Sequence, residues 1–430
     1  MVVDPSAVMD LQTLVREWTR QHVRAESLEE VEAVAVEVSR VVGQAVADEA
    51  LAGTARRSYE GSSRPCACGR KAKFMGYRGR NLVTLVGEVR VARAYYYCRH
   101  CRSGVAPWDA AQGLSERCYS PAVKAVVTET AARMPYGGGM AFLARLTPLR
   151  IEESAAEGIV DEVGGRVRAA QAEAQASSLS GLTPWPAGPP VVRLYVTMDG
   201  SAAHIDGDWH EVKTGAVYEA RPGEEGVDAS GPKRYVSAQE PAEAFTARLY
   251  VEALQAGVHH AQEVVVIGDG AAWIWNLADE YFPHAVPIVD RFHAKQYLSD
   301  VAKAIYGAGS DLATQWARQR YDQLDAGDID LIIAALNLQA THCEAARKCS
   351  DYLQTNRTRL RYHEFRAQGL CTSTGVVEAG CKLAIGTRLK RAGMHWTLPG
   401  ANAIIALRCC QLSRRYADFW EVRAEGGLSA

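Results

Sequence analysis

Residues 263–270 read EVVVIGDG, an apolar run that ends in an aspartate between two glycines. A short, fully apolar run before a turn signal predicts a buried β-strand that ends at Asp269. Residues 191–200, VVRLYVTMDG, repeat this pattern and predict a second strand that ends at Asp199. One such aspartate is an ordinary turn residue. Two of them indicate a site, because ligands and metals gather at strand ends in open α/β sheets.

The elements around these two strands predict the fold. Residues 191–289 give, in this order, three strands, a helix, a strand, a helix and a strand. Besides the two strands above, we predict strands at 210–219, 233–238 and 285–289. The two helices are predicted at 241–257 and 271–281. This is the element order of a ribonuclease-H-like fold, in which the first and fourth strands are neighbours. We therefore expect Asp199 and Asp269 to converge. We assign residues 191–430 to this α/β domain, with an all-helical insertion at about 295–366.

Two converging aspartates predict a site for Mg²⁺ or Mn²⁺, which prefer carboxylate oxygens. A third carboxylate on a later helix completes a site for two metal ions, one activating the attacking oxygen and one stabilising the leaving oxygen of a phosphodiester. Glu378, in the segment TGVVE, is our candidate, because Lys382, Arg388, Lys390 and Arg391 follow it and suit a phosphate-bearing substrate. Asp290, at the end of the fifth strand, is the alternative.

A basic segment with paired cysteines precedes this domain. Between residues 64 and 102 the chain carries ten Lys or Arg and one acid, although its overall net charge is −2. Two close cysteine pairs, Cys66 with Cys68 and Cys98 with Cys101, bracket strand-like residues and predict a structural Zn²⁺ site in a zinc-ribbon-like module. The Cys-x-Cys spacing departs from the usual Cys-x-x-Cys, so His100 is a substitute ligand, and four free thiols are the alternative reading. We expect Arg78, Arg80, Arg90 and Arg93 to contact the DNA backbone.

The rest of the amino-terminal half is predicted to be helical. We divide it into helices over 1–60, the zinc-ribbon-like module over 61–110, a helix-turn-helix-like segment over 111–176 and a Pro- and Gly-rich linker over 177–190. The helix-turn-helix interpretation depends on a helix at 121–133, a turn at 136–139, a short helix at 140–146 and a further helix from Thr147 or Pro148 towards Gly164. Other helical bundles share this pattern.

Composition limits the class of protein. A chain of 430 residues with 48% hydrophobic residues is expected to fold into two to four globular domains. The eleven cysteines do not form the framework of a secreted disulfide-rich protein. Neither a bilayer-spanning run nor a signal peptide is evident, so we expect a cytoplasmic, nucleoid-associated protein.

Several motifs resemble those of bacterial insertion-sequence transposases of the ISKra type, in the DDE superfamily. They are GDGAAWIWN at 268–276, VDRFHA at 289–294, STGVVE at 373–378, RLKRAGMHW at 388–396, GAN at 400–402, YYYCRHC at 95–101 and APWD at 106–109. The resemblance covers roughly residues 60–412. It implies that Asp199, Asp269 and Glu378 bind two Mg²⁺ or Mn²⁺ ions per active site, and that Asp290 and His293 are accessory residues.

The resemblance also implies an activity and partners. It predicts DNA cleavage at the ends of an insertion sequence, strand transfer into target DNA, and a homo-oligomer that is at least a dimer. Lys382, Arg388, Lys390, Arg391 and Trp396 are then expected to contact DNA. Two alternatives stay open: a non-catalytic DNA-binding regulator derived from a transposase, and a ribonuclease-H-like nuclease without strand transfer.

Overall fold

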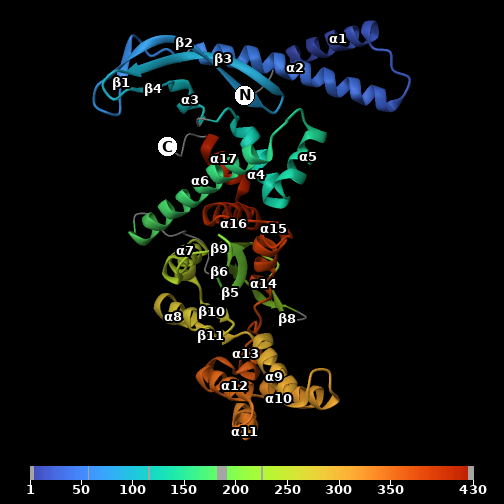
Figure 1. The fold of residues 1–430 in the computed structure, drawn as a ribbon, viewed down its shortest axis with the longest axis vertical. Coiled ribbons are helices and arrows are strands. Elements are labelled where there is room, and N and C mark those ends of the chain that lie inside the picture. The colour runs from blue at the N-terminus through green and yellow to red at the C-terminus, as the bar shows by residue number, and fades with distance from the viewer. Residues whose placement is uncertain (1–3, 57, 115–116, 182–190, 224–225, 425–430) are drawn as a thin grey trace. The chain divides into compact units, whose positions relative to one another are not determined.

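The computed structural model describes residues 4–56, 58–114, 117–181, 191–223 and 226–424. These residues form a mixed α/β protein (Figure 1) that divides into two compact units. Unit 1 comprises residues 1–127 and 140–152, and unit 2 comprises 128–139 and 153–430. No helix in the described part of the chain is long and apolar enough to cross a membrane.

Unit 1 begins with two helices, α1 (Pro5–His22) and α2 (Leu28–Arg56). The Ser27 hydroxyl accepts the Glu30 N–H at 3.2 Å, which starts α2 where the sequence predicted it. A four-stranded antiparallel sheet follows, formed by β1 (Ser63–Pro65), β2 (Lys71–Thr84), β3 (Gly87–Cys98) and β4 (Ser103–Val105). A buried apolar cluster joins α2, this sheet and the short helix α3 (Pro107–Ala111); it contains Ala55, Leu82, Val89, Val91 and Trp108.

Three helices span the predicted helix-turn-helix-like segment. Helix α4 (Pro121–Arg133) has the predicted bounds, but the predicted turn at 136–139 is wrong, because α5 (Tyr136–Leu146) begins there. The Gly139 N–H donates to the Pro135 carbonyl at 2.8 Å, and a Cβ on Gly139 would lie 3.1 Å from the Thr130 methyl group. The glycine thus serves close packing on α4. Helix α6 (Glu153–Leu179) starts and ends later than predicted, and residues 182–190 of the predicted linker lie outside the described residues.

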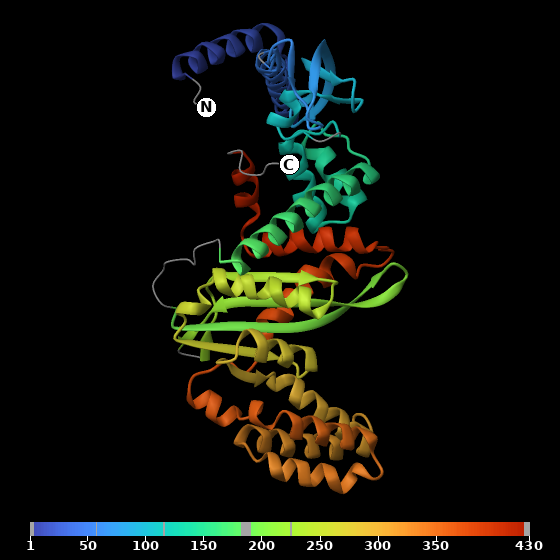
Figure 2. The ribbon, with the colours of Figure 1, turned by 90° about the vertical axis from the view of Figure 1, so that its left-hand side faces the viewer.

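Unit 2 contains a five-stranded sheet, with strand order β11-β10-β5-β6-β9 (Figure 2). The strands are β5 (Arg193–Ile205), β6 (Asp208–Glu219), β9 (Lys233–Ala238), β10 (Glu263–Gly268) and β11 (Val286–Val289). Strands β5, β6 and β9 pair antiparallel, whereas β10 and β11 run parallel to β5. The prediction that the first and fourth predicted strands are neighbours is confirmed, because β10 pairs with β5.

The prediction that a strand ends at Asp199 is wrong. Strand β5 continues to Ile205 and pairs with β6 along its whole length, from Leu194 opposite Glu219 to Ile205 opposite Asp208. The hairpin closes only at Asp206 and Gly207, both with positive φ. Asp199 therefore lies within a strand, and the Asp199-Gly200 pair makes no turn.

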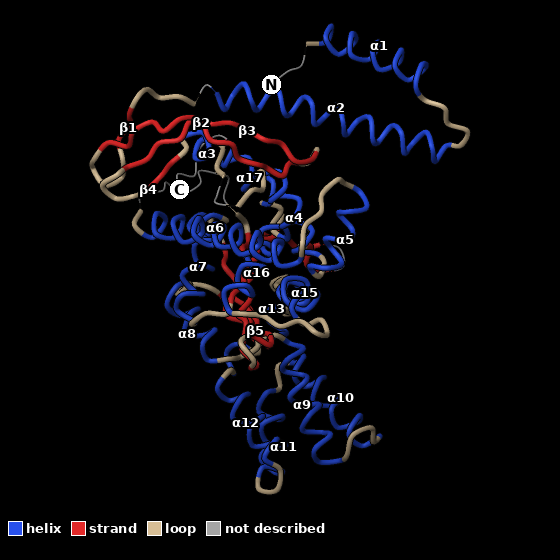
Figure 3. Tube along the Cα trace, turned by 45° about the horizontal axis from the view of Figure 1, so that its top comes forward, coloured by secondary structure: helices blue, strands red, loops and turns tan. Residues whose placement is uncertain are grey.

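The remaining elements of unit 2 are mostly helical (Figure 3). Helices α7 (Ala242–Gln255) and α8 (Ala272–Tyr281) lie on either side of β10 in the chain, as predicted. The helical stretch before Glu378 consists of α9 (Arg291–Tyr306), α10 (Asp311–Ala326), α11 (Ile329–Ala340), α12 (Glu344–Thr355) and α13 (Tyr362–Ala367). The chain then forms α14 (Gly375–Cys381), a π-helical turn (Lys382–Gly386), α15 (Thr387–Leu389), α16 (Leu398–Leu412) and α17 (Tyr416–Ala424). A small hairpin of β7 (Arg221–Gly223) and β8 (Gly226–Asp228) was not predicted.

Candidate functional site

Three aspartates occupy corresponding positions on three adjacent parallel strands of unit 2. Ile267 of β10 pairs with Thr197 of β5, so Asp269 and Asp199 each lie two residues beyond a paired position. Gly268 pairs with Val289 of β11, so Asp290 lies one residue beyond the pair, beside Asp269. Since neighbouring strands are about 4.8 Å apart, this register brings the three residues to one region of the sheet.

Asp199 is half-buried, and its carboxylate has two hydrogen-bond donors. The Gly200 N–H donates to Oδ1 at 2.8 Å, and the Cys381 thiol donates to Oδ2 at 3.5 Å. Burial raises the pKa of Asp199 above its ordinary value of 3.8, and the nearby Asp269 carboxylate raises it further, against the lowering effect of these donors. Burial also raises the pKa of the Cys381 thiol to about 12, which keeps this group protonated and able to donate.

Asp269 is fixed by the backbone and by the helical segment before Glu378. Its Oδ1 accepts the Ala271 N–H at 2.9 Å, and its carbonyl accepts the Tyr352 hydroxyl at 3.0 Å. Gly270 has a φ of +100°, and a Cβ there would lie 2.5 Å from a ring carbon of Tyr352. Glycine is therefore required after Asp269, both for its backbone conformation and for the approach of Tyr352.

Glu378 lies on α14, which packs against β5 and β6. The helix comes close to the sheet at Gly380, where a Cβ would lie 2.8 Å from the Tyr235 ring. Cys381, one turn beyond Glu378, makes the contact with Asp199 described above. The Glu378 carboxylate is only weakly engaged: Oε1 lies 3.4 Å from the Thr374 hydroxyl and Oε2 lies 3.9 Å from Lys382 Nζ.

Asp290 has the most complete set of partners of these acids. It is fully buried and caps α9, accepting the His293 N–H at 2.7 Å through Oδ1. Its Oδ2 accepts both the Thr374 N–H and the Thr374 hydroxyl. Local sequence gave no indication of Thr374, Tyr352 or Cys381, since their contacts with the three aspartates span between 83 and 182 residues of sequence.

In the described parts of the chain, the oxygens of Asp199, Asp269 and Glu378 do not all lie within 4.8 Å of one another. Among the described residues, one group of three or more His, Cys, Asp or Glu side chains has all its ligand atoms within 4.8 Å of one another. It is the cysteine cluster of unit 1, which consists of Cys66, Cys68, Cys98 and Cys101.

These four cysteines can hold a metal ion such as zinc. The Sγ atoms of Cys66 and Cys101 are 3.5 Å apart, and those of Cys68 and Cys98 are 3.6 Å apart. Zn–S bonds of about 2.3 Å at tetrahedral angles place sulfurs roughly 3.8 Å apart, whereas a disulfide bond is about 2.0 Å long. The Ser103 hydroxyl and backbone N–H lower the pKa of Cys101 to about 6, which favours the thiolate that metals bind. The Cys-x-Cys spacing is therefore compatible with a metal site.

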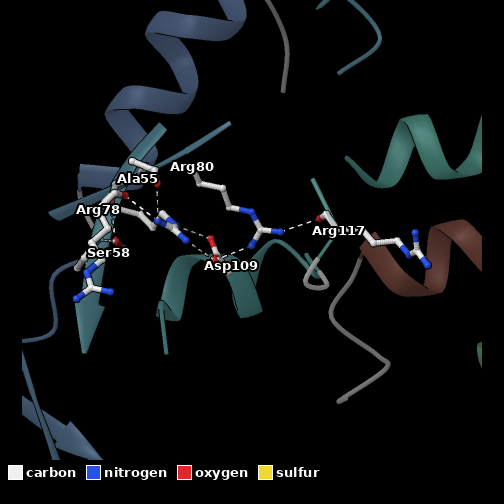
Figure 4. A network of polar contacts seen from close by, with 9 residues as sticks. Ala55, Ser58, Arg78, Arg80, Asp109 and Arg117 are labelled. Carbon is white, nitrogen blue, oxygen red and sulfur yellow. Dashed lines mark hydrogen bonds and ion pairs between the residues drawn. The ribbon is translucent and has the colours of Figure 1, made fainter. Parts of the chain in front are cut away.

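Two of the four arginines that were expected to contact DNA form ion pairs within unit 1 instead (Figure 4). Arg80 and Arg93 both bind the Asp109 carboxylate, at 2.7 and 3.0 Å, and their side chains are only 14% and 12% exposed. Arg80 also donates to the Arg117 carbonyl. These two arginines tie the strands to α3, so the expectation that they contact phosphates is not supported. Arg78 and Arg90 are exposed, although Arg78 lies over the Tyr95 ring.

The basic residues after Glu378 also divide into buried and exposed side chains. Arg388 is fully buried between the rings of Tyr136 and Trp396, and its Nε donates to the Ala131 carbonyl at 2.8 Å. Burial lowers the pKa of Arg388 to about 10. Trp396 is also buried, so neither Arg388 nor Trp396 is placed to contact DNA as expected. The other three predicted cations, Lys382, Lys390 and Arg391, are exposed.

The fold and these sites define a two-unit, mixed α/β protein with a four-cysteine cluster in one unit and a row of aspartates on the sheet of the other. The chain belongs to the uncharacterised protein family UPF0236, whose family model matches residues 24–414. No curated protein matches the chain.

Proposed function

We propose that this protein is a DDE transposase that cleaves DNA at insertion-sequence ends and transfers the strands into target DNA. The observation that carries the proposal is the placement of Asp199 and Asp269 at corresponding positions on neighbouring parallel strands. The strand order β11-β10-β5-β6-β9, with three antiparallel strands and two parallel to β5, supports assigning residues 191–430 to the ribonuclease-H-like class. Asp269 lies in the ISKra-type motif GDGAAWIWN and Glu378 lies in STGVVE, which supports the transposase class.

The proposed metal ligands are Asp199, Asp269 and Glu378. Their hard carboxylate oxygens suit Mg²⁺ or Mn²⁺, and a divalent cation would favour the charged form of Asp199, whose pKa is raised mainly by burial and further by the Asp269 charge. When bound, two such ions activate the attacking oxygen and stabilise the leaving oxygen of the phosphodiester. Because the three side chains are not all within 4.8 Å of one another, the proposal requires them to move closer together when metal binds. The weak contacts of Glu378 with Thr374 and Lys382 leave its side chain free to move.

The contacts of Asp290 favour Glu378 over Asp290 as the third ligand. Both carboxylate oxygens of Asp290 already accept hydrogen bonds from buried donors, and the side chain is fully buried. A metal ion at Asp290 would compete with these donors, and each donor left unsatisfied would cost about 1–3 kcal/mol. The Glu378 side chain is 36% exposed, and its carboxylate has no such set of donors to lose.

Other parts of the chain have proposed supporting roles. Lys382, Lys390 and Arg391 are exposed cations that we assign to phosphate contacts. Lys390 Nζ donates to the Ser201 hydroxyl at 2.7 Å, two residues from Asp199, so this cation is near the site. Zinc in the four-cysteine cluster would be structural, as in a zinc ribbon, and Arg78 and Arg90 would contact the DNA backbone. Helices α4, α5 and α6 would form the helix-turn-helix-like reader, and two DNA ends would require at least a dimer acting on nucleoid DNA.

The decisive experiment uses end-labelled duplex DNA that includes the sequences flanking the coding region of this chain. The protein is incubated with this DNA and Mg²⁺ or Mn²⁺, beside Asp199→Asn, Asp269→Asn and Glu378→Gln. We expect wild type to cut and join the DNA and each variant to lose at least about 100-fold in rate, since each removes a charged ligand of the proposed metal ions. Asp208→Asn is the matched control, because Asp208 is exposed in the β5–β6 hairpin.

Three outcomes would contradict parts of the proposal. Binding of the DNA without cleavage would support the non-catalytic regulator. Cleavage without joining would support a ribonuclease-H-like nuclease. Cleavage that survives Glu378→Gln but not Asp290→Asn would show that the third ligand is Asp290.

A further inference from the structure

Asp290 lies where three segments of unit 2 meet, and it is hydrogen-bonded to all three: the end of β10, the first turn of α9 and the residue before α14. The Asp290 backbone N–H donates to the carbonyl of Gly268 at 2.7 Å. Gly268 directly precedes Asp269, so this bond holds Asp290 beside Asp269. The Asp290 side chain begins α9 by accepting the His293 N–H. The same side chain accepts the N–H and the hydroxyl of Thr374, 84 residues further along the chain.

Thr374 determines where α14 begins. The Thr374 carbonyl accepts the Glu378 N–H at 2.9 Å, the first backbone bond of the helix, and its hydroxyl is 3.4 Å from Glu378 Oε1. A second bond, from the Arg291 N–H to the Thr372 carbonyl at 2.9 Å, joins the same two segments. The position of the Asp290 carboxylate thus sets the position of the first turn of α14, where Glu378 lies.

We infer that Asp290 is a positioning residue that holds Glu378 in register with Asp269 through Thr374. The inference rests on the proposed function, because it concerns the alignment of the proposed metal ligands. Three donors converge on the two oxygens of Asp290, and a carboxylate, which carries no hydrogen, can accept all of them. An asparagine at this position has only one acceptor oxygen. In either orientation of the amide, its NH₂ group would therefore face a backbone N–H, that of His293 or that of Thr374. Because two donors would then oppose each other, we expect the start of α14 to open locally.

The test compares Asp290→Asn, Thr374→Val and Thr374→Ser with Asp300→Asn, which makes the same chemical change at an exposed position on α9. The first readout is amide hydrogen exchange of residues 372–381 in the absence of divalent ions. We expect about tenfold faster exchange in Asp290→Asn, which replaces the buried carboxylate, and in Thr374→Val, which removes the hydroxyl that donates to it. Thr374→Ser keeps the hydroxyl and should exchange as wild type does.

The second readout is Mn²⁺ binding by titration calorimetry without DNA. Loss of a residue that orients a ligand weakens metal affinity by about 10- to 100-fold, so we expect this range for Asp290→Asn and Thr374→Val. The double variant should be no weaker than the worse single variant, because both changes remove one interaction. A direct ligand would instead make Asp290→Asn bind as poorly as Asp269→Asn while Thr374→Val binds normally, and this result would overturn the inference.

The two readouts separate failure of this inference from failure of the proposed function. If wild type does not bind Mn²⁺, the proposed metal site is wrong, and the exchange data still decide whether Asp290 positions α14. If exchange of residues 372–381 is the same in Asp290→Asn, Asp300→Asn and wild type, the positioning role is overturned whatever the metal affinity.

Discussion

Asp199 and Asp269 lie at corresponding positions on two neighbouring parallel strands, each two residues beyond the pair formed by Thr197 and Ile267. This register follows from the pairing of β5 with β10, although β6, β7, β8, β9 and α7 lie between them in the sequence. It places two acids close enough for the charge of one to raise the pKa of the other. Burial is the larger cause of this raised pKa, and the charge of Asp269 adds to it.

The raised pKa of Asp199 predicts how metal-free stability depends on pH. The folded state favours the protonated carboxyl, so this group stabilises the fold fully below its ordinary value of 3.8. That stabilisation is lost as pH rises through the raised pKa. Asp199→Asn should therefore abolish part of the loss of stability between about pH 4 and neutral pH. Urea unfolding of both proteins across this range, with a chelator present, measures the difference; parallel curves for the two proteins would contradict the prediction.

The four-cysteine cluster predicts one zinc ion per chain that depends on each thiolate. Cys98→Ser should reduce the zinc content to background and destabilise the sheet formed by β1 to β4. Because all four ligands bind zinc as thiolates, protons compete with the metal, and wild type should release zinc as pH falls. Elemental analysis after dialysis at several pH values measures both effects. Cys343→Ser, outside the cluster, is the control and should keep its zinc.

Because Arg388 is buried, we expect its substitution to lower the stability of the protein strongly and to have no direct effect on DNA binding. Arg388→Ala should lower the free energy of unfolding by about 3–5 kcal/mol, because it leaves a cavity between two aromatic rings and an unpaired Ala131 carbonyl. Arg388→Met should cost less, since it fills more of the space and removes a charge that burial disfavours. Thermal and urea unfolding measure these values. Arg391→Ala, at an exposed position, should stay within about 0.5 kcal/mol of wild type; an equally small effect at Arg388 would mean that this side chain is not buried.

Gly270 lies so close to Tyr352 of α12 that we expect any side chain at this position to clash with it. Gly270→Ala should cost roughly 2–4 kcal/mol, from the positive φ and from the approach of a Cβ to the Tyr352 ring. Gly257→Ala separates the two causes, because Gly257 also has a positive φ, in the left-handed region, and a Cβ there would make only an ordinary contact at 3.5 Å, with Val191. It should cost about 1 kcal/mol. Adding Tyr352→Ala to Gly270→Ala should cost less than the sum of the single changes, and simple additivity would argue against the contact.

The local sequence was sufficient for elements whose pattern is strong and continuous. The apolar run before Asp269 forms β10, and Ser120-Pro121 and Pro135 bound a helix at the predicted residues. Cysteines two and three residues apart gave the metal-binding cluster, since short spacings fix thiols near one another before any long-range contact forms. Hydrophobic period, turn residues and close spacing act over a few residues, and so a single sequence can reveal them.

Tertiary packing decided the rest. Asp199-Gly200 looks like a turn, but pairing with β6 carries β5 six residues past Asp199. Arg388 and Trp396 look like surface residues of a basic segment, yet both are buried beside Tyr136, about 250 residues earlier in the sequence. The sequence alone therefore determined which acids and thiols the protein carries and most of its strands and helices. Only the tertiary structure decided which charges are exposed and which acid is held by Thr374, because burial and hydrogen bonding depend on partners that are distant in the chain.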